Sequence, residues 1–282
     1  MKAEKQGVHW GLALVLSVLC ALPVSADEQS TAAVTPLTLG VVPQQSSLKL
    51  AKAWMPLLQE VSRRSGIPLV FATAPDIPTY EKRLHEGAYD LAYMNPYHYT
   101  VFHDTNGYEA LAKAKDVQIH GIYVVRRAST ITDLAQLAGL ELAYPAPAAF
   151  AASVVTQANL AKVATPGKQA YVLSHDAVYR AVASGRYEAG GGILRTFSAV
   201  EPSVRDQLKI LWTSPGYTPH PIATHPNIDG DKRHRLRRAL ISLAQDPAGQ
   251  ALLEPLKISG FEEANDADWD DVRDLHIHRL DP

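Results

Sequence analysis

The strongest constraint on this chain's fold is an alternation of short β-forming runs with helical segments. The first pair is an apolar run at 37–42, followed at 48–65 by apolar residues at helical spacing. The same order recurs along the chain as far as a strand expected at 208–212. Such alternation favours an α/β fold with mostly parallel sheets, each flanked by helices.

The expected elements fall into two series, and the end of the chain is helical. Strands are expected at 37–42, 68–73, 91–94, near 111, 122–125, 141–144, 170–173, from 189, and 208–212. Helices are expected at 48–65, 77–86, 97–103, 131–137, 148–161, 174–184, 235–245, 247–256 and 269–275. Extended connectors near 119–126 and 214–225 suggest two lobes joined by two crossovers. The expected lobes are 36–120 with the return segment 222–282, and 121–221.

The N-terminus has the composition of a secretory signal peptide. Lys2 and Lys5 precede an apolar stretch at 10–22, which is short for a membrane span. Val24 and Ala26 supply the small residues of a cleavage site. We therefore expect residues 1–26 to be removed and the mature protein to be exported to the periplasm.

The position of Cys20, the single cysteine, leaves two alternatives for this segment. An uncleaved anchor helix is one, and lipid attachment at Cys20 is the other, although Leu19 is larger than the residue that normally precedes a lipidated cysteine. Cleavage after Ala26 leaves a mature chain without cysteine, so it has no disulfide. The polar residues at 27–35 are expected to form a disordered leader.

Charge and residue counts argue against several classes of protein. The chain has 27 basic and 29 acidic residues, which gives no electrostatic footprint for nucleic acid. Its eleven histidines show no metal-binding spacing. Ser174-His175-Asp176 invites comparison with a hydrolase triad, but consecutive helical residues diverge by about 100°. We therefore expect neither an enzyme nor a metal or cofactor site.

Loops that follow strands and open helices are the candidate binding sites. Three of them, at 44–47, 146–153 and 174–176, are rich in small or hydroxyl residues. Helix N-termini attract anions through free N–H groups and the helix dipole, although the serines also suit plain N-caps. Arg195 follows a run of three glycines, and its guanidinium group suits a phosphate-like or carboxylate ion. The alternative for Arg195 is a surface ion pair.

Two stretches carry a resemblance to a known family. The run Tyr89-Asp90-Leu91-Ala92-Tyr93-Met94-Asn95-Pro96-Tyr97 and the run Ser174-His175-Asp176-Ala177-Val178 resemble signatures of the phosphate-, phosphite- and phosphonate-binding proteins of ABC importers. The resemblance covers about 37–275. It implies a monomeric, two-lobed periplasmic binding protein of type II topology that closes on a small oxyanion for an inner-membrane permease. By position, it assigns ligand contacts to Tyr80, Asn95, Tyr97, Tyr123, Ser174 and His175.

The chain departs from that family where the family has a hydroxyl-rich loop. The family pattern is close to Ser-Thr-Ser-Gly, whereas this chain has Ala149-Phe150-Ala151-Ala152, with Ser153 just beyond. Backbone N–H groups from Ala149 onward are kept, but side-chain donors worth about 1.5–3 kcal/mol each to an anion are lost.

The residues before Arg195 also lack the acid with which relatives pair a ligand's amine. We therefore expect a ligand other than an aminoalkylphosphonate, and we add Ala149, Ser153 and Arg195 to the candidate site. A sensory subunit that signals to a membrane histidine kinase is the alternative function, because both roles need the same lobes and hinge.

Overall fold

The computed structural model describes residues 1–3, 7 and 35–280. The chain divides into Met1–Ala33 and a compact unit, Val34–Pro282, which carries all the elements below. The expected cleavage site after Ala26, and nearly all of the expected signal peptide and leader, lie outside the described residues. Within the described ranges, no helix has the length and apolar character needed to cross a membrane.

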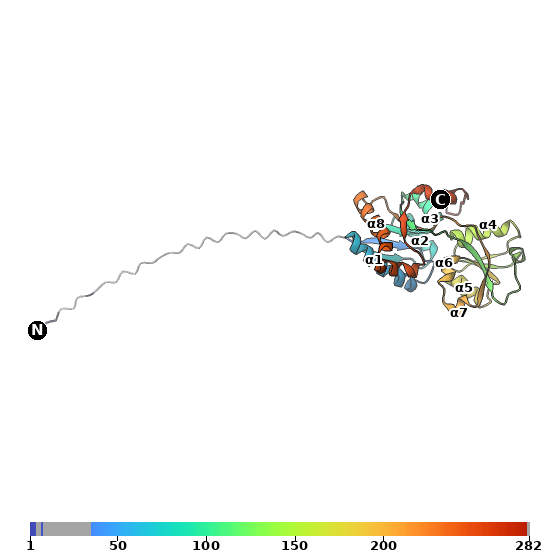
Figure 1. Ribbon diagram of the computed structural model, residues 1–282, viewed down its shortest axis with the longest axis horizontal. Coiled ribbons are helices and arrows are strands. Elements are labelled where there is room, and N and C mark those ends of the chain that lie inside the picture. The colour runs from blue at the N-terminus through green and yellow to red at the C-terminus, as the bar shows by residue number, and fades with distance from the viewer. Residues whose placement is uncertain (4–6, 8–34, 281–282) are drawn as a thin grey trace. The chain divides into compact units, whose positions relative to one another are not determined.

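Six strands form the first sheet, in the order β11-β4-β10-β3-β1-β2. They are β1 (Leu37–Val41), β2 (Leu69–Thr73), β3 (Leu91–Tyr93), β4 (Glu109–Ala114), β10 (Pro221–Thr224) and β11 (Phe261–Glu263). The accompanying helices are α1 (Ser47–Ser65), α2 (Ile77–His85), α3 (Pro96–Asn106), α8 (Gly230–Ser242), η3 (Leu243–Gln245), α9 (Pro247–Leu253), η4 (Glu254–Leu256), η5 (Asp266–Trp269) and α10 (Asp270–Arg273). We call this sheet with its helices the first half (Figure 1).

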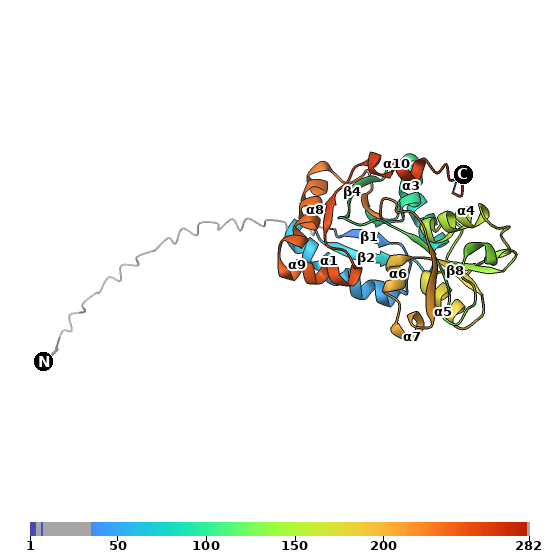
Figure 2. The same ribbon diagram turned by 45° about the vertical axis from the view of Figure 1, so that its right-hand side comes forward.

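Five strands form the second sheet, in the order β7-β6-β8-β5-β9. They are β5 (Gly121–Arg126), β6 (Leu142–Tyr144), β7 (Gln169–Tyr171), β8 (Ala189–Ile193) and β9 (Leu208–Thr213). The accompanying helices are η1 (Leu134–Leu137), the π-helix η2 (Phe150–Val155), α4 (Thr156–Ala161), α5 (His175–Ala183), α6 (Leu194–Ser198) and α7 (Pro202–Arg205). We call this sheet with its helices the second half. Figure 2 shows α6 on the side of the second half that faces β1 and β2.

Both sheets are mixed, which corrects the expectation that they are mostly parallel. β1 pairs in parallel with β2 and β3, but β10 runs antiparallel to β3 and β4, and β5 runs antiparallel to β8 and β9. The reason lies in the crossovers, because β5 and β10 are the strands by which the chain enters one sheet from the other. The predicted α/β class, with two sheets flanked by helices, is confirmed.

Local signals in the sequence predicted the long elements well. The helical spacing predicted for 48–65 is confirmed in α1, where the apolar side chains of one face are buried: Leu50, Trp54, Leu57, Leu58 and Val61. The helix ends at Gly66, whose φ of 66° suits the left-handed C-cap that glycine adopts without strain. Asp76 caps α2, since its carboxylate accepts a hydrogen bond of 2.8 Å from the N–H of Thr79.

Short elements differ from the expectation. The extended connector expected at 214–225 contains β10, and α6, α7 and β11 were not expected. The helix expected at 148–161 is divided into η2 and α4. A strand of three or four residues carries too little periodicity to be recognised, because pairing with its neighbours decides whether it forms.

The glycine run in β8 lets neighbouring elements pack directly onto backbone. A Cβ atom at Gly191 would lie 2.0 Å from the carbonyl oxygen of Ala152 in η2, and one at Gly190 would lie 2.4 Å from the Val178 side chain in α5. These glycines therefore allow a close approach, which is made by the protein's own backbone and side chains.

Candidate functional site

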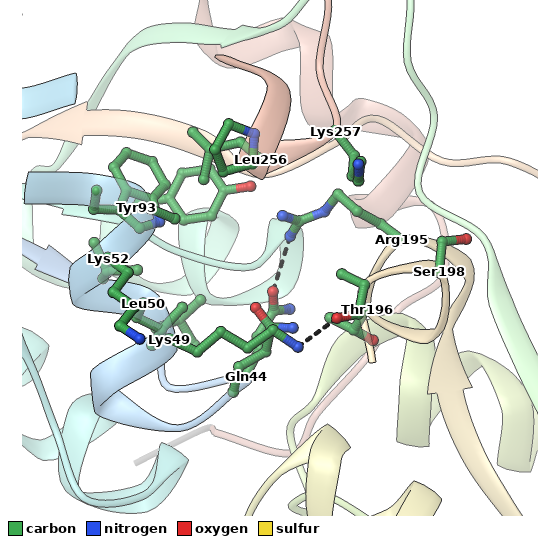
Figure 3. A pocket seen from close by; sticks show the side chains of 17 residues that line it. Gln44, Lys49, Leu50, Lys52, Tyr93, Arg195, Thr196, Ser198, Leu256 and Lys257 are labelled. Carbon is green, nitrogen blue, oxygen red and sulfur yellow. Dashed lines mark hydrogen bonds between the residues drawn. The ribbon is translucent and has the colours of Figure 1, made fainter. Parts of the chain in front are cut away.

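Two cavities have walls that combine residues of both halves. Tyr93 at the end of β3, Arg195 and Ser198 in α6, and Lys257 after η4 line both of them. The first, of about 440 Å³, we call the lysine cavity because Lys49, Lys52 and Lys257 line it (Figure 3). The second, of about 360 Å³, we call the apolar cavity, and its apolar wall consists of Ala114, Val117, Ile119, Leu194, Pro219 and Ile258.

Arg195 reaches from the second half to the first. Its Nη2 atom donates a hydrogen bond of 2.9 Å to Oε1 of Gln44 (Figure 3). Its Cζ atom lies 5.8 Å from the centre of the Tyr93 ring, within cation–π range. Among the residues that the structure describes, Arg195 has no ion pair with a carboxylate. Its charge is therefore not neutralised by a salt bridge with any described residue.

Gln44 makes three hydrogen bonds at this junction, and two of them, with Arg195 and His175, connect the two halves. Besides accepting from Arg195, its Nε2 atom lies 2.9 Å from Nε2 of His220. Its carbonyl oxygen accepts a hydrogen bond of 3.1 Å from the N–H of His175, which begins α5. Gln44 is buried, so each of these bonds is made away from water. Its place in the loop after the first strand was recognised in the sequence, but its role as a connector was not.

The two histidines at this junction are neutral at physiological pH. Burial, and to a smaller extent the charge of Arg195, lowers the pKa of His175 to about 3. Burial also lowers the pKa of His220, and the charge of Arg195 acts in the same direction. The positive charge of the site therefore resides on Arg195 and the lysines, while the histidine rings serve as neutral hydrogen-bonding groups.

A third, very small cavity lies at the loop that resembles the family's hydroxyl-rich segment. Asn95, Ala149 and His175, all predicted site residues, line it together with Phe150, Ala151 and Ala152. Its volume of about 10 Å³ is that of roughly one water molecule. Asn95 is the N-cap of α3, and its Nδ2 atom donates a hydrogen bond of 3.2 Å to the carbonyl oxygen of Ala148, in the other half.

Five other predicted site residues lie outside the walls of these three cavities. The Tyr80 hydroxyl donates to the carbonyl oxygens of Gly40 and Tyr93, and the Tyr123 hydroxyl lies 2.6 Å from that of Tyr144. Ser174 caps α5 by accepting a hydrogen bond from the N–H of Ala177.

Tyr97 and Ser153 complete that group. The Tyr97 hydroxyl accepts hydrogen bonds of 2.7 and 2.9 Å from the N–H groups of Arg279 and Leu280. Ser153 is fully buried, and its hydroxyl has no hydrogen-bond partner among the described residues. Of the predicted site residues, Asn95, Ala149 and His175 thus line the small cavity, and Arg195 lines the two larger ones.

Sequence reasoning missed the lysines. Lys49 and Lys52 lie on α1, where they read as ordinary polar positions of an amphipathic helix. Lys257 lies far along the chain, in the return segment, and no local signal connects it with Arg195. Only the contact between distant segments shows that these side chains share a cavity.

Within the described residues, no group of three or more histidine, cysteine or acidic side chains is arranged to hold a metal ion. Individual histidines contact other kinds of side chain. His98 lies 2.9 Å from Glu81, whereas the His225 ring contacts Tyr108 edge-on.

Comparison with known proteins gives a consistent result. The family model described as "ABC transporter, phosphonate, periplasmic substrate-binding protein" matches residues 39–269. The phosphonates-binding periplasmic protein of Escherichia coli (strain K12) is 21% identical over 276 residues, which cover 91% of this chain and 79% of that protein.

Solved structures agree with the fold. PhnD1 from Prochlorococcus marinus (MIT 9301), in complex with methylphosphonate, superposes with a TM-score of 0.76 at 15% identity, over 85% of this chain and 96% of that one. A binding-protein component of an ABC phosphonate transporter from Pseudomonas aeruginosa gives a TM-score of 0.73 at 19% identity, over 86% of this chain and 85% of that one. The type II binding-protein architecture predicted from the sequence is confirmed.

Proposed function

Since the chain belongs to the family of periplasmic substrate-binding proteins of phosphonate ABC transporters, which are not enzymes, we propose that it captures an anionic solute between its two halves. The observation that supports this most is the charge of the cavity walls. Arg195, Lys49, Lys52 and Lys257 line them, and no described lining residue is acidic. A small oxyanion of the phosphate, phosphite or phosphonate type suits such walls, because guanidinium and ammonium groups are the usual partners of phosphate oxygens.

Capture is proposed to work by closure of two lobes about a hinge. The proposed lobes are 36–120 with 222–282, and 121–221, so two crossover segments connect them. A ligand that contacts both lobes binds the closed arrangement better and shifts the population toward it. The hydrogen bonds of Arg195 with Gln44 and of Asn95 with Ala148, which connect the two halves, support this proposal.

The closed protein is proposed to deliver its ligand to an inner-membrane ABC permease. Export to the periplasm would follow from the expected signal peptide at 1–26. Mass spectrometry of protein recovered from the periplasm checks this step, because cleavage after Ala26 gives a chain that begins at Asp27. A chain that begins at Met1 would contradict it.

Binding is tested by titration calorimetry and thermal unfolding of the purified protein with phosphate, phosphite and methylphosphonate. A ligand present at 100 times its dissociation constant is expected to stabilise the folded state by about 2.7 kcal/mol, which raises the melting temperature by several degrees. Sodium chloride and choline chloride at matched ionic strength are the controls. If none of the oxyanions changes the melting temperature or releases heat on binding, the proposal is wrong.

A further inference from the structure

We infer that the anion binds beside Arg195 in the lysine cavity, and that it is a phosphonate or phosphate monoester whose apolar organic substituent occupies the apolar cavity. This rests on the proposed function and specifies the ligand class of the same cleft. The argument uses the charge, the size and the shape of the two cavities.

Charge places the anionic group in the lysine cavity. Lys52 has no ion pair among the described residues, and Arg195 has none either. Lys49 donates to the carbonyl oxygen of Ala199 and also interacts electrostatically with the carboxylates of Asp176 and Glu201, neither of which lines the cavity. The net excess of positive charge suits a doubly charged group, and the Arg195 fork can bind two of its oxygens.

Lys257 is held where its side chain can reach that group. It follows η4 with φ of 57°, a left-handed conformation that glycine normally takes at such a position. Its ammonium group pairs with Glu254, and both side chains are largely exposed. An exposed pair of this kind is weak, so an anion in the cavity competes for Lys257 at little cost.

The size of the two larger cavities favours an occupant larger than a small oxyanion alone. The small cavity beside Ala149 has room for roughly one water molecule, so a tetrahedral ion does not fit there in this arrangement of the halves. The lysine and apolar cavities measure about 440 and 360 Å³, within the usual range for sites that hold organic molecules. A phosphate ion alone fills only a small part of this space.

The shape of the boundary between the cavities indicates where the substituent lies. The Tyr93 ring lines both, and it is fixed by Trp54 at 4.7 Å and by His220 at 5.2 Å between ring centres. Beyond it, six of the thirteen residues that line the apolar cavity are aliphatic or proline, including Val117, Leu194 and Ile258. An aryl or alkyl group bound to the phosphorus on this side is removed from water, which favours binding.

The test compares phenylphosphonate with methylphosphonate, since they share the charged group and differ in the apolar part. Phenylphosphonate is expected to bind at least about tenfold more tightly by calorimetry, and its uncharged diethyl ester is expected not to bind. Arg195→Ala and Lys257→Ala should weaken both anions about tenfold or more. Leu194→Ser, at a partly exposed position, should weaken phenylphosphonate binding more than methylphosphonate binding and so reduce the preference. Lys168→Ala, on the surface of the second half, is the matched charge control.

The outcomes separate this inference from the proposed function. If methylphosphonate or phosphate binds and phenylphosphonate binds no more tightly, the inference is overturned and the proposed function stands. A phenyl preference that survives Leu194→Ser, or an affinity for both anions that survives Arg195→Ala, in variants with native circular dichroism, also overturns it. If phosphate, phosphite and both phosphonates all fail to bind, the proposed function fails as well.

Discussion

Lys257 combines a backbone conformation that suits glycine with a side chain that lines both cavities. Its φ of 57° brings Cβ close to its own backbone, a contact that glycine avoids. Lysine is thus present at a position where glycine, which has no side chain, would give a more stable fold. Strain of this kind is often found at functional positions, where the surrounding structure maintains it.

Replacing Lys257 with glycine should separate stability from binding. We expect Lys257→Gly to raise the free energy of unfolding by about 0.5–1 kcal/mol, because the left-handed backbone is relaxed. Anion affinity should fall, because an ammonium group is lost. Urea unfolding and calorimetry measure the two effects. Lys257→Ala, which removes the charge and keeps Cβ, should lose affinity without gaining stability. Equal stability of the glycine and alanine variants would contradict this explanation.

For single residues, the sequence predicted which chemical groups matter better than it predicted which residues those groups contact. Arg195 was singled out for its guanidinium group, and the structure places that group between the halves; ligand contact stays a prediction. Tyr80 and Tyr123 were assigned by position in a motif, but their hydroxyls bond within the core. The partner of a tyrosine hydroxyl depends on which distant segments pack beside it, and a motif does not contain that information.

At the scale of elements, α1 is anchored by a charged network at its end. Glu60 accepts hydrogen bonds from Arg63 and Arg64, and these lower its pKa from 4.5 to about 2. Arg64 also donates to the carbonyl oxygen of Ser242 and to Asp246, so the network connects α1 with α8 and α9.

The depressed pKa of Glu60 predicts a pH-dependent effect of Glu60→Gln. A carboxyl group whose pKa is lower in the folded state contributes stability above its unfolded pKa of about 4.5 and loses it as the pH falls toward 2. The variant should therefore be less stable at pH 7 by at most about 1 kcal/mol, since the network is partly exposed to solvent. Urea unfolding from pH 7 to pH 3 should show this difference shrinking. Glu86→Gln, in an exposed pair with Lys82, is the control. A difference that is constant over this range would contradict the prediction.

Elements long enough to show periodicity were predictable, and short ones were not. The spacing in α1 and the caps Asp76 and Gly66 set their own boundaries locally. By contrast, α6 has five residues, although it carries Arg195. The π-helix η2 was not predicted either. It packs against the glycine backbone of β8, and this contact between distant segments leaves no local signal in the sequence.

At the scale of the whole molecule, Gln44 is the side chain that most directly joins the two halves. We expect Gln44→Ala to weaken anion binding about tenfold, because the bond to Arg195 is lost and the closed arrangement is disfavoured. Small-angle scattering should show a larger radius of gyration without ligand. Gln250→Ala is the control, because Gln250 is exposed and its side chain donates a hydrogen bond to the carbonyl oxygen of Ala244, a near neighbour in the chain. Unchanged affinity and unchanged scattering would show that Gln44 does not hold the halves together.

The order of strands and helices was enough to predict two sheets and the α/β class. It did not predict the direction of β5 and β10, since alternation says how elements follow one another and not how a strand arriving from elsewhere pairs. The cavities could not be predicted from the sequence either, because they form where Tyr93, Arg195 and Lys257 meet from three distant parts of the chain.

The glycine-rich strand β8 affects how natural sequence variation in this protein should be interpreted. At Gly190 and Gly191 even a methyl group collides with its surroundings, at 2.4 and 2.0 Å. A survey of tolerated substitutions would show a block of invariance a few residues before Arg195, as severe as that of any ligand contact. Invariance at these glycines would reflect the close packing of β8 against its neighbours. It should therefore be set aside before residues near Arg195 are ranked by importance for specificity.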